Sequence, residues 1–168
     1  MPHGERRPDA GVAVRVCAVV DTFVAASPAA VWTVLTDFDG YPAWNPFVIG
    51  IDTGGAYGRG ALWHVTRVGT GGRPATIDVV LDTWKAEREF AWVGGSHRRW
   101  QLSGRHSFVL IPADGGTVLR QAERVHGLWA LTRRRDLQVA MREQFGRMNE
   151  ALRLEVESGT SSDHGREP

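Results

Sequence analysis

The sequence of 168 residues contains a single cysteine, Cys17. One cysteine excludes a disulfide bond within the chain and any metal site built from paired cysteines. Cys17 lies in a valine-rich run, where an inert, buried thiol is the ordinary state, because a reactive cysteine needs a polarising neighbour. We therefore expect neither redox nor thiolate chemistry.

Charge of neither sign is in excess, since 20 basic residues, all arginine except Lys85, balance 19 acidic residues. No basic face is evident, and we expect no nucleic-acid partner. No apolar run approaches the roughly 20 residues that span a bilayer, so stable membrane insertion is not expected. Residues 1–11 lack the apolar centre of a signal peptide, which predicts a cytoplasmic protein.

Several catalytic motifs are also missing. The chain has no paired histidines of the zinc-protease type, no nucleophile elbow around a serine and no clustered cysteine or histidine ligands. The glycines at 69–73 fit a hairpin turn better than a phosphate-binding loop. These absences predict a protein with no metal and no cofactor.

The sequence is nevertheless that of a globular domain with a large core, at 42% hydrophobic residues and seven tryptophans. Residues 1–12 and 159–168 are polar and are expected to be flexible tails around a single domain of residues 13–158. Whether the chain is a monomer or a homodimer is left open.

The order of elements predicts an α+β fold. A strand at 12–26 ends at Ser27 and Pro28, an N-cap and first residue typical of a helix. Six strand-like segments follow between residues 47 and 127, separated by turn signals. From about residue 132 to Ser158 the pattern becomes helical, with one apolar stripe made of Leu137, Met141, Phe145, Met148, Leu152 and Val156.

This long amphipathic helix must bury its stripe against one face of the antiparallel sheet. If the sheet curves, helix and sheet cannot close completely, and a lined hollow remains between them. The stretch "GYPAWNPFV" at 40–48 is unusual, because its prolines argue against a regular helix or strand while its aromatics are too apolar for a solvated loop. Trp44 and Phe47 are either core residues or ligand contacts, and Asn45 is expected to cap backbone groups of the loop.

Four segments in this order resemble the START/Bet v 1-like (SRPBCC) helix-grip superfamily, in particular its polyketide cyclase/dehydrase-like branch. They are "SPAAVWTVLTDFDGYPAWNPF", "RHSFVLIPADGGT", "QAERVHGL" and "FGRMNEALRLEVE". The resemblance implies a curved seven-stranded antiparallel sheet around the C-terminal helix, with two short helices between strands 1 and 2. It also implies a hollow that receives a hydrophobic or amphipathic small molecule.

Strand alternation selects candidate residues for this hollow. In "RHSFVLIPA" the bulky Phe108 and Leu110 share a face with His106. In "LRQAERVHG" the two arginines belong in water, so Gln121, Glu123 and Val125 point inward beside His106. A buried His and Glu are able to transfer protons, although such a pair is also common as a purely structural contact.

Other candidates depend on less certain facing. We expect Trp63 to point inward and His64 outward, with the reverse as the alternative. Trp92 shares the facing of Phe90 and is a candidate wall residue, whereas Trp84 follows Asp78 and Asp82 in parity and is expected at an exposed or edge position. The ligand-binding set predicted from the sequence comprises Trp44, Phe47, Trp63, Trp92, Phe108, Leu110, Gln121, Val125, Met141, Phe145 and Met148.

We therefore expect a protein that binds a polyketide, aromatic or lipid-like molecule. If it is an enzyme of cyclisation or dehydration, His106 and Glu123 are the candidate base and acid, with Gln121 donating to a carbonyl. A non-catalytic carrier or sensor of hydrophobic ligands, or a protein-interaction module, is the alternative. The role of the run Arg133, Arg134 and Arg135 is left open.

Overall fold

The computed structural model describes residues 15–95, 103–126 and 134–163. Seven antiparallel strands form one sheet with the order β1-β7-β6-β5-β4-β3-β2. The elements in chain order are β1 (Arg15–Val24), α1 (Pro28–Thr36), α2 (Tyr41–Trp44), β2 (Val48–Asp52), β3 (Leu62–Val68), the 3₁₀ turn η1 (Thr70–Gly72), β4 (Pro74–Lys85), β5 (Glu89–Gly95), β6 (Ser103–Ala113), β7 (Gly116–His126) and α4 (Arg134–Asp163).

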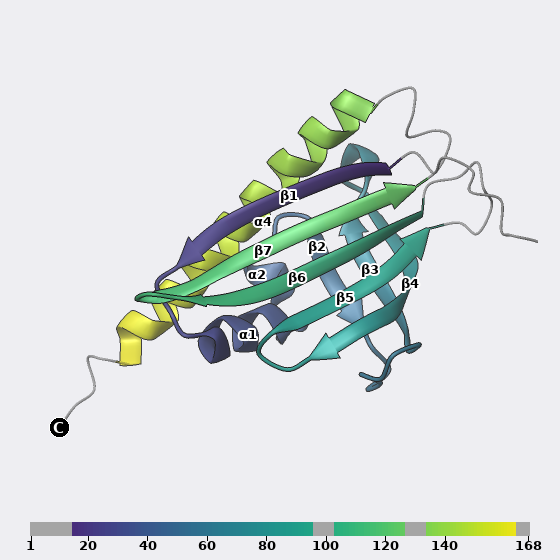
Figure 1. Ribbon diagram of the computed structural model, residues 1–168. Coiled ribbons are helices and arrows are strands. Elements are labelled where there is room, and N and C mark those ends of the chain that lie inside the picture. Colours follow the sequence, from purple (N-terminus) through teal and green to yellow (C-terminus); the bar gives the residue numbers. More distant parts are fainter. Residues whose placement is uncertain (1–14, 96–102, 127–133, 164–168) are drawn as a thin grey trace, which may run out of the picture.

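The sheet curves around α4, which crosses its concave side, while α1 and α2 close one end (Figure 1). Sequential strands from β2 to β7 are joined as neighbours, and β1 pairs with β7 at the far edge. This arrangement is the helix-grip fold, so the predicted fold class, including the two short helices between β1 and β2, is confirmed.

Helix α1 begins as the sequence predicts. The Ser27 hydroxyl accepts a hydrogen bond from the Ala30 amide at 3.3 Å, and Pro28 occupies the first turn, where its missing N–H costs nothing. Val31 and Leu35 are buried. Helix α1 therefore packs inward with the side that carries these two residues.

The prediction that residues 40–48 form no regular helix is wrong for its first half. Tyr41–Trp44 make one helical turn, and Pro42 is tolerated because the first turn of a helix has no backbone acceptor for its N–H. The Tyr41 side chain is fully buried and its hydroxyl donates to the Leu35 carbonyl at 2.8 Å. Asn45 caps the following turn as predicted, since its Oδ1 accepts from the amides of Phe47 and Val48 at 2.9 Å each.

The last helix, α4, packs chiefly on β1 and also touches α1 and β7. Met141, Phe145, Met148, Leu152 and Val156 are buried as predicted, and Leu137 is partly buried beside them. The helix continues to Asp163 and not to Ser158, where the sequence analysis ended it. Among the described residues, no helix combines the length and the apolar composition needed to span a membrane.

The predicted position of Trp84 is wrong. The pairing of β4 with β5 shifts register between Leu81 and Thr83, so an extra residue reverses the alternation that follows. Trp84 therefore turns inward and meets Trp32 and Trp63 with ring centroids 5.0 Å and 5.7 Å away. A bulge leaves no signal in a parity count, which explains the error.

Some predictions fall outside the described residues. These include the N-terminal tail 1–12, the end of the C-terminal tail beyond Asp163 and the position of Arg133. Arg134 and Arg135 begin α4 and are exposed, which leaves their role untested.

We predict that Leu152→Ala destabilises the domain by about 2–5 kcal/mol, because Leu152 is 1% exposed and its removal leaves a cavity between α4 and the sheet. Leu154→Ala is the matched control, since Leu154 lies on the same helix and is 55% exposed. Its expected effect is within about 0.5 kcal/mol. Chemical denaturation of both variants measures the difference, and equal losses would contradict the packing of α4.

Candidate functional site

The concave face of the sheet carries three cross-strand rows of side chains near its middle. The first row contains Trp84, Phe90, Phe108 and Gln121, the second Leu81, Trp92, His106 and Glu123, and the third Val79, Gly94, Gly104 and Val125. Aromatic bulk thus fills one end of the face, polar groups occupy the middle, and two adjacent glycines follow. Free volume opens where the side chains become small.

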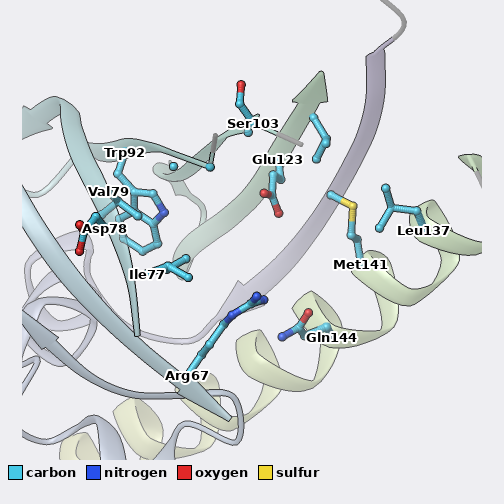
Figure 2. A pocket seen from close by; sticks show the side chains of 14 residues that line it. Arg67, Ile77, Asp78, Val79, Trp92, Ser103, Glu123, Leu137, Met141 and Gln144 are labelled. Carbon is cyan, nitrogen blue, oxygen red and sulfur yellow. The ribbon is translucent and has the colours of Figure 1, made fainter. Parts of the chain in front are cut away.

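Two connected chambers lie between this face and α4. The outer chamber has a volume of about 610 Å³, and the inner one of about 120 Å³. Both are lined by Arg67, Ile77, Trp92, Glu123 and Gln144. Figure 2 shows the outer chamber between strand residues such as Trp92 and Glu123 and the α4 residues Leu137, Met141 and Gln144. The hollow expected from the curved sheet is therefore present.

The His106 side chain lies between side chains of the neighbouring strands β5 and β7 and of helix α4. Its ring stacks on Trp92 at 5.2 Å and meets the edge of Phe145 at 5.0 Å. Nδ1 lies 3.5 Å from the Glu123 carboxylate, and Nε2 lies 3.0 Å from the Gln121 amide nitrogen. Both ring nitrogens are therefore occupied by protein groups.

Glu123 lies beside His106 and lines both chambers. Burial by itself would raise the pKa of its carboxyl group, but the hydrogen bond from His106 and the electrostatic interactions with His106 and Arg67 outweigh burial. The net effect holds the pKa of Glu123 below its usual range. Glu123 is therefore a carboxylate at neutral pH.

Gly104 makes room for this carboxylate. A Cβ atom at position 104 would lie 2.7 Å from Glu123 Oε1, which is too close for a real contact. Its φ angle is not in the left-handed region, so the backbone itself does not demand glycine. We infer that the missing side chain serves the position of Glu123.

Arg67 is a site residue that the sequence analysis missed. It follows Trp63 and Val65 at the spacing of one strand face and extends into the outer chamber toward Gln144 (Figure 2). Within the described part of the chain no carboxylate is close enough to form an ion pair with it. The parity of β3 contained this signal, because an arginine two residues beyond an inward valine faces the same side. Gln144 of α4 was also missed.

Most of the predicted site residues line a chamber. Phe47, Trp92, His106, Phe108, Gln121, Glu123, Phe145 and Met148 line the inner one, and Val125 and Met141 the outer one. Phe47 is covered by the Arg147 guanidinium, 5.0 Å from its ring centroid. These residues come from three strands, the loop after α2, and α4.

Three predicted ligand contacts lie elsewhere, since Trp44, Trp63 and Leu110 line neither of these two chambers. Trp63 points inward as expected but is fully buried, and its indole N–H donates to the Ala56 carbonyl at 2.7 Å. Trp44 packs against Tyr41 with ring centroids 4.8 Å apart. His64 faces outward, and its Nδ1 lies 2.8 Å from Asp78.

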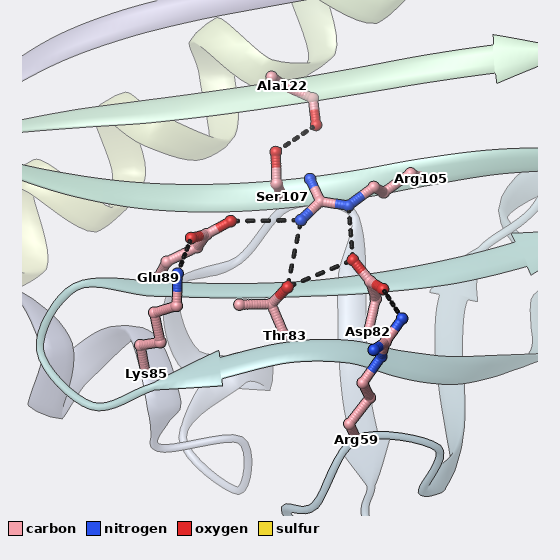
Figure 3. A network of polar contacts seen from close by, with 8 residues as sticks. All are labelled: Arg59, Asp82, Thr83, Lys85, Glu89, Arg105, Ser107 and Ala122. Atoms are coloured by element: carbon pink, nitrogen blue, oxygen red, sulfur yellow. Dashed lines mark hydrogen bonds and ion pairs between the residues drawn. The ribbon is translucent and has the colours of Figure 1, made fainter.

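On the opposite face of β6, Arg105 ties three strands together behind the site (Figure 3). Its guanidinium donates to Asp82 at 2.7 Å, to Thr83 at 3.3 Å and to Glu89 at 3.2 Å. The hydrogen bond from Arg105 lowers the pKa of Asp82. This network spans the bulge in β4 and so holds in register the strands that carry Trp92 and His106.

No group of three or more His, Cys, Asp or Glu side chains in the described ranges is arranged to hold a metal ion. The polar side chains that line the chambers are instead one imidazole, two carboxylates, one guanidinium, two amides and one hydroxyl. Such a set suits recognition and proton transfer on an organic molecule.

The fold and the chambers define a helix-grip protein with a hollow between sheet and helix. The profile of the family described as polyketide cyclase/dehydrase and lipid transport matches residues 15–157, and the chain belongs to this family. The resemblance seen in the sequence is thereby confirmed. No curated protein sequence matches the chain significantly.

Solved structures share the fold at low sequence identity. The di-domain ARO/CYC StfQ from the steffimycin biosynthetic pathway has a TM-score of 0.73 at 14% identity, covering 88% of this chain and 52% of that one. This chain thus spans about half of StfQ. The Zhui aromatase/cyclase from Streptomyces sp. R1128 has a TM-score of 0.64 at 19% identity, with 86% and 94% covered. Ara h 8.0201 has a TM-score of 0.59 at 17% identity, with 86% and 99% covered.

We predict that Gly104→Ala displaces the Glu123 carboxylate and separates it from His106, because the new methyl group occupies its place. The ring NMR signals of His106, recorded at one fixed pH, should move relative to those of the unaltered protein. Gly94→Ala is the matched control, since Gly94 pairs directly with Gly104 but its added Cβ meets Val79, at 2.9 Å. If the His106 ring signals of both variants match those of the unaltered protein, Gly104 does not position Glu123.

We also predict that Glu123 stabilises the fold in a pH-dependent way. Because its pKa is lowered on folding, its contribution is fully present above the unfolded value of about 4.3 and is lost as pH falls through the folded value. The free energy of unfolding lost in Glu123→Gln should therefore be largest at neutral pH and shrink below about pH 4. Urea denaturation across this range checks it, and a constant difference would contradict it.

Proposed function

We propose that the protein binds a hydrophobic or amphipathic small molecule of polyketide or aromatic type in the two chambers and catalyses its cyclisation and dehydration. The observation that carries this proposal is a carboxylate and a guanidinium, the latter without an ion-pair partner among the described residues, that line both chambers. Family membership and the fold shared with aromatase/cyclases support the reaction class.

The charge states suggest which group moves the proton. Because the pKa of Glu123 is lowered, this residue suits the role of base, which reverses the roles that the sequence analysis assigned to it and His106. Both nitrogens of His106 are already engaged, so His106 suits the role of orienting Glu123 and Gln121. A carboxylate of low pKa is a weak base, and the reaction therefore needs an acidic substrate carbon.

A carbon between two carbonyl groups meets this need. Glu123 accepts its proton, and the negative charge moves onto the carbonyl oxygen to form an enolate. The Arg67 guanidinium stabilises this developing charge, which lowers the barrier. The enolate carbon then attacks another carbonyl of the same chain, and the new alkoxide takes up the proton that Glu123 carries, which gives a β-hydroxy ketone. Glu123 then removes the second proton of the attacking carbon, and the hydroxyl group of the neighbouring carbon leaves as water with that proton as the C=C double bond forms. The chamber walls hold the chain folded, which removes a further part of the barrier.

A carrier of hydrophobic ligands is the second candidate. Two observations favour a carrier: the His106 ring stacks on Trp92, and both of its nitrogens already contact protein groups. A histidine with these contacts can have a purely structural role. A carrier would bind the same class of molecule in the same chambers without changing it.

We predict that Glu123→Gln lowers turnover of a linear poly-β-carbonyl thioester by about 10²–10⁴-fold while binding of an apolar fluorescent probe changes little. The control is Glu155→Gln, because Glu155 is exposed on α4 and lines neither chamber. Mass spectrometry of the products and probe titration separate the two effects. Probe binding with no turnover by the unaltered protein would indicate a carrier, and absence of both would refute the proposal.

A further inference from the structure

Gln121 is a buried amide whose two ends have different surroundings. The side chain lines the inner chamber and the residue is 1% exposed. Its nitrogen lies 3.0 Å from His106 Nε2 and 3.5 Å from the Met148 sulfur. Its oxygen is buried and has no hydrogen-bond partner in the described structure. A buried carbonyl oxygen without a donor is costly, so this atom calls for an explanation.

The orientation of the Gln121 amide follows from the contact between His106 and Glu123. The Glu123 carboxylate is ionised and accepts only, so His106 Nδ1 must carry the proton that it shares with Glu123. In the neutral ring Nε2 is then the acceptor, and it takes a hydrogen bond from the Gln121 amino group. The chain of donors from Gln121 through His106 to Glu123 therefore leaves the Gln121 oxygen as the free acceptor.

Two other buried amides also have one unpartnered atom, Asn45 Nδ2 and Asn149 Oδ1. Neither residue lines the inner or the outer chamber. Asn45 caps the loop after α2, and Asn149 donates to the Thr22 hydroxyl, so each already has a structural contact. Gln121 alone among these three combines a free acceptor with a position at a chamber.

The inner chamber has the size and lining for one ring. Its volume is about 120 Å³, somewhat less than the roughly 150 Å³ of a cavity that admits benzene, and it continues into the outer chamber. Aromatic side chains supply much of its wall, namely Phe47, Trp92, His106, Phe108 and Phe145. Such walls favour a flat, apolar ring.

We propose that the inner chamber is a subsite for a ring that carries a hydroxyl group, whose O–H donates to the Gln121 side-chain oxygen. This assignment rests on the proposed function, and it specifies the end of the ligand that enters first. The Met148 sulfur lies 3.5 Å from the amide nitrogen, and its unbranched, flexible chain is suited to move as a ligand enters. The Gln121 oxygen is buried from water, so the ligand hydroxyl supplies a bond that solvent does not.

The test uses phenol and toluene, which have the same ring and nearly the same size but differ in the hydroxyl group. Dissociation constants are measured by NMR titration, following the indole N–H signal of Trp92, in the unaltered protein and in Gln121→Met. We expect the preference for phenol over toluene to fall by about tenfold in the variant, the factor expected for one hydrogen bond. Loss of the His106 contact affects both ligands and cancels in the ratio.

Glu123→Leu gives a second test that keeps Gln121 in place. Without the carboxylate, His106 is free to carry its proton on Nε2, and the Gln121 amide then turns its oxygen toward His106. The phenol preference should weaken in this variant and the affinity for benzaldehyde, which only accepts, should rise.

The outcomes are distinguishable. Equal preference in the unaltered protein and Gln121→Met, or tighter binding of benzaldehyde than of phenol to the unaltered protein, overturns the hydroxyl assignment. An unchanged preference in Glu123→Leu overturns the link through His106. In each of these cases toluene binding still supports the proposed function, whereas failure of all three probes to bind contradicts both.

Discussion

Helix α4 packs on the sheet chiefly along one edge, and the rest of the structure depends on this asymmetry. The closest packing is on β1, the edge strand, where Met141 and Phe145 form a cluster with Val16 and Ala18. The sheet curves away from that line, so strands β3 to β6 lie farther from the helix, and only long side chains such as that of His106 reach it. Side chains fill the space between helix and sheet at the end closed by α1 and α2, and leave two chambers toward the other end.

The same asymmetry separates core from site along each strand. At the closed end, Trp84 packs edge to face with Trp63 and with Trp32, and the Phe90 ring contacts all three tryptophans. Two rows further along β5 and β6 the side chains shrink to Gly94 and Gly104. His106 and Glu123 lie between these regions, where burial is strong enough to couple them and an open volume still reaches the carboxylate. The polar pair thus occupies the boundary between solid packing and hollow.

Both faces of β6 contribute to this arrangement. Arg105 points outward and binds Asp82 and Glu89, while the next residue, His106, points inward toward Glu123 and Gln121. The outer ion pairs hold neighbouring strands in register, and the inner contacts use that register to bring an imidazole, a carboxylate and an amide together. Because side chains alternate between the two faces of β6, the same strand carries an ion-pair network on its outer face and polar groups of the chambers on its inner face.

The sequence by itself determined the order of elements, the apolar stripe of α4 and the inward facing of His106, Gln121 and Glu123, because these follow from local periodicity. It failed at Trp84, where a bulge reverses the alternation, and at Tyr41–Trp44, where a short helix accommodates a proline. It also failed to single out Arg67 and Gly104. Their importance comes from what lies across the chamber or the neighbouring strand, namely Gln144 and Glu123. Only the curvature and register of the sheet decide such distances, since they arise between segments far apart in the chain.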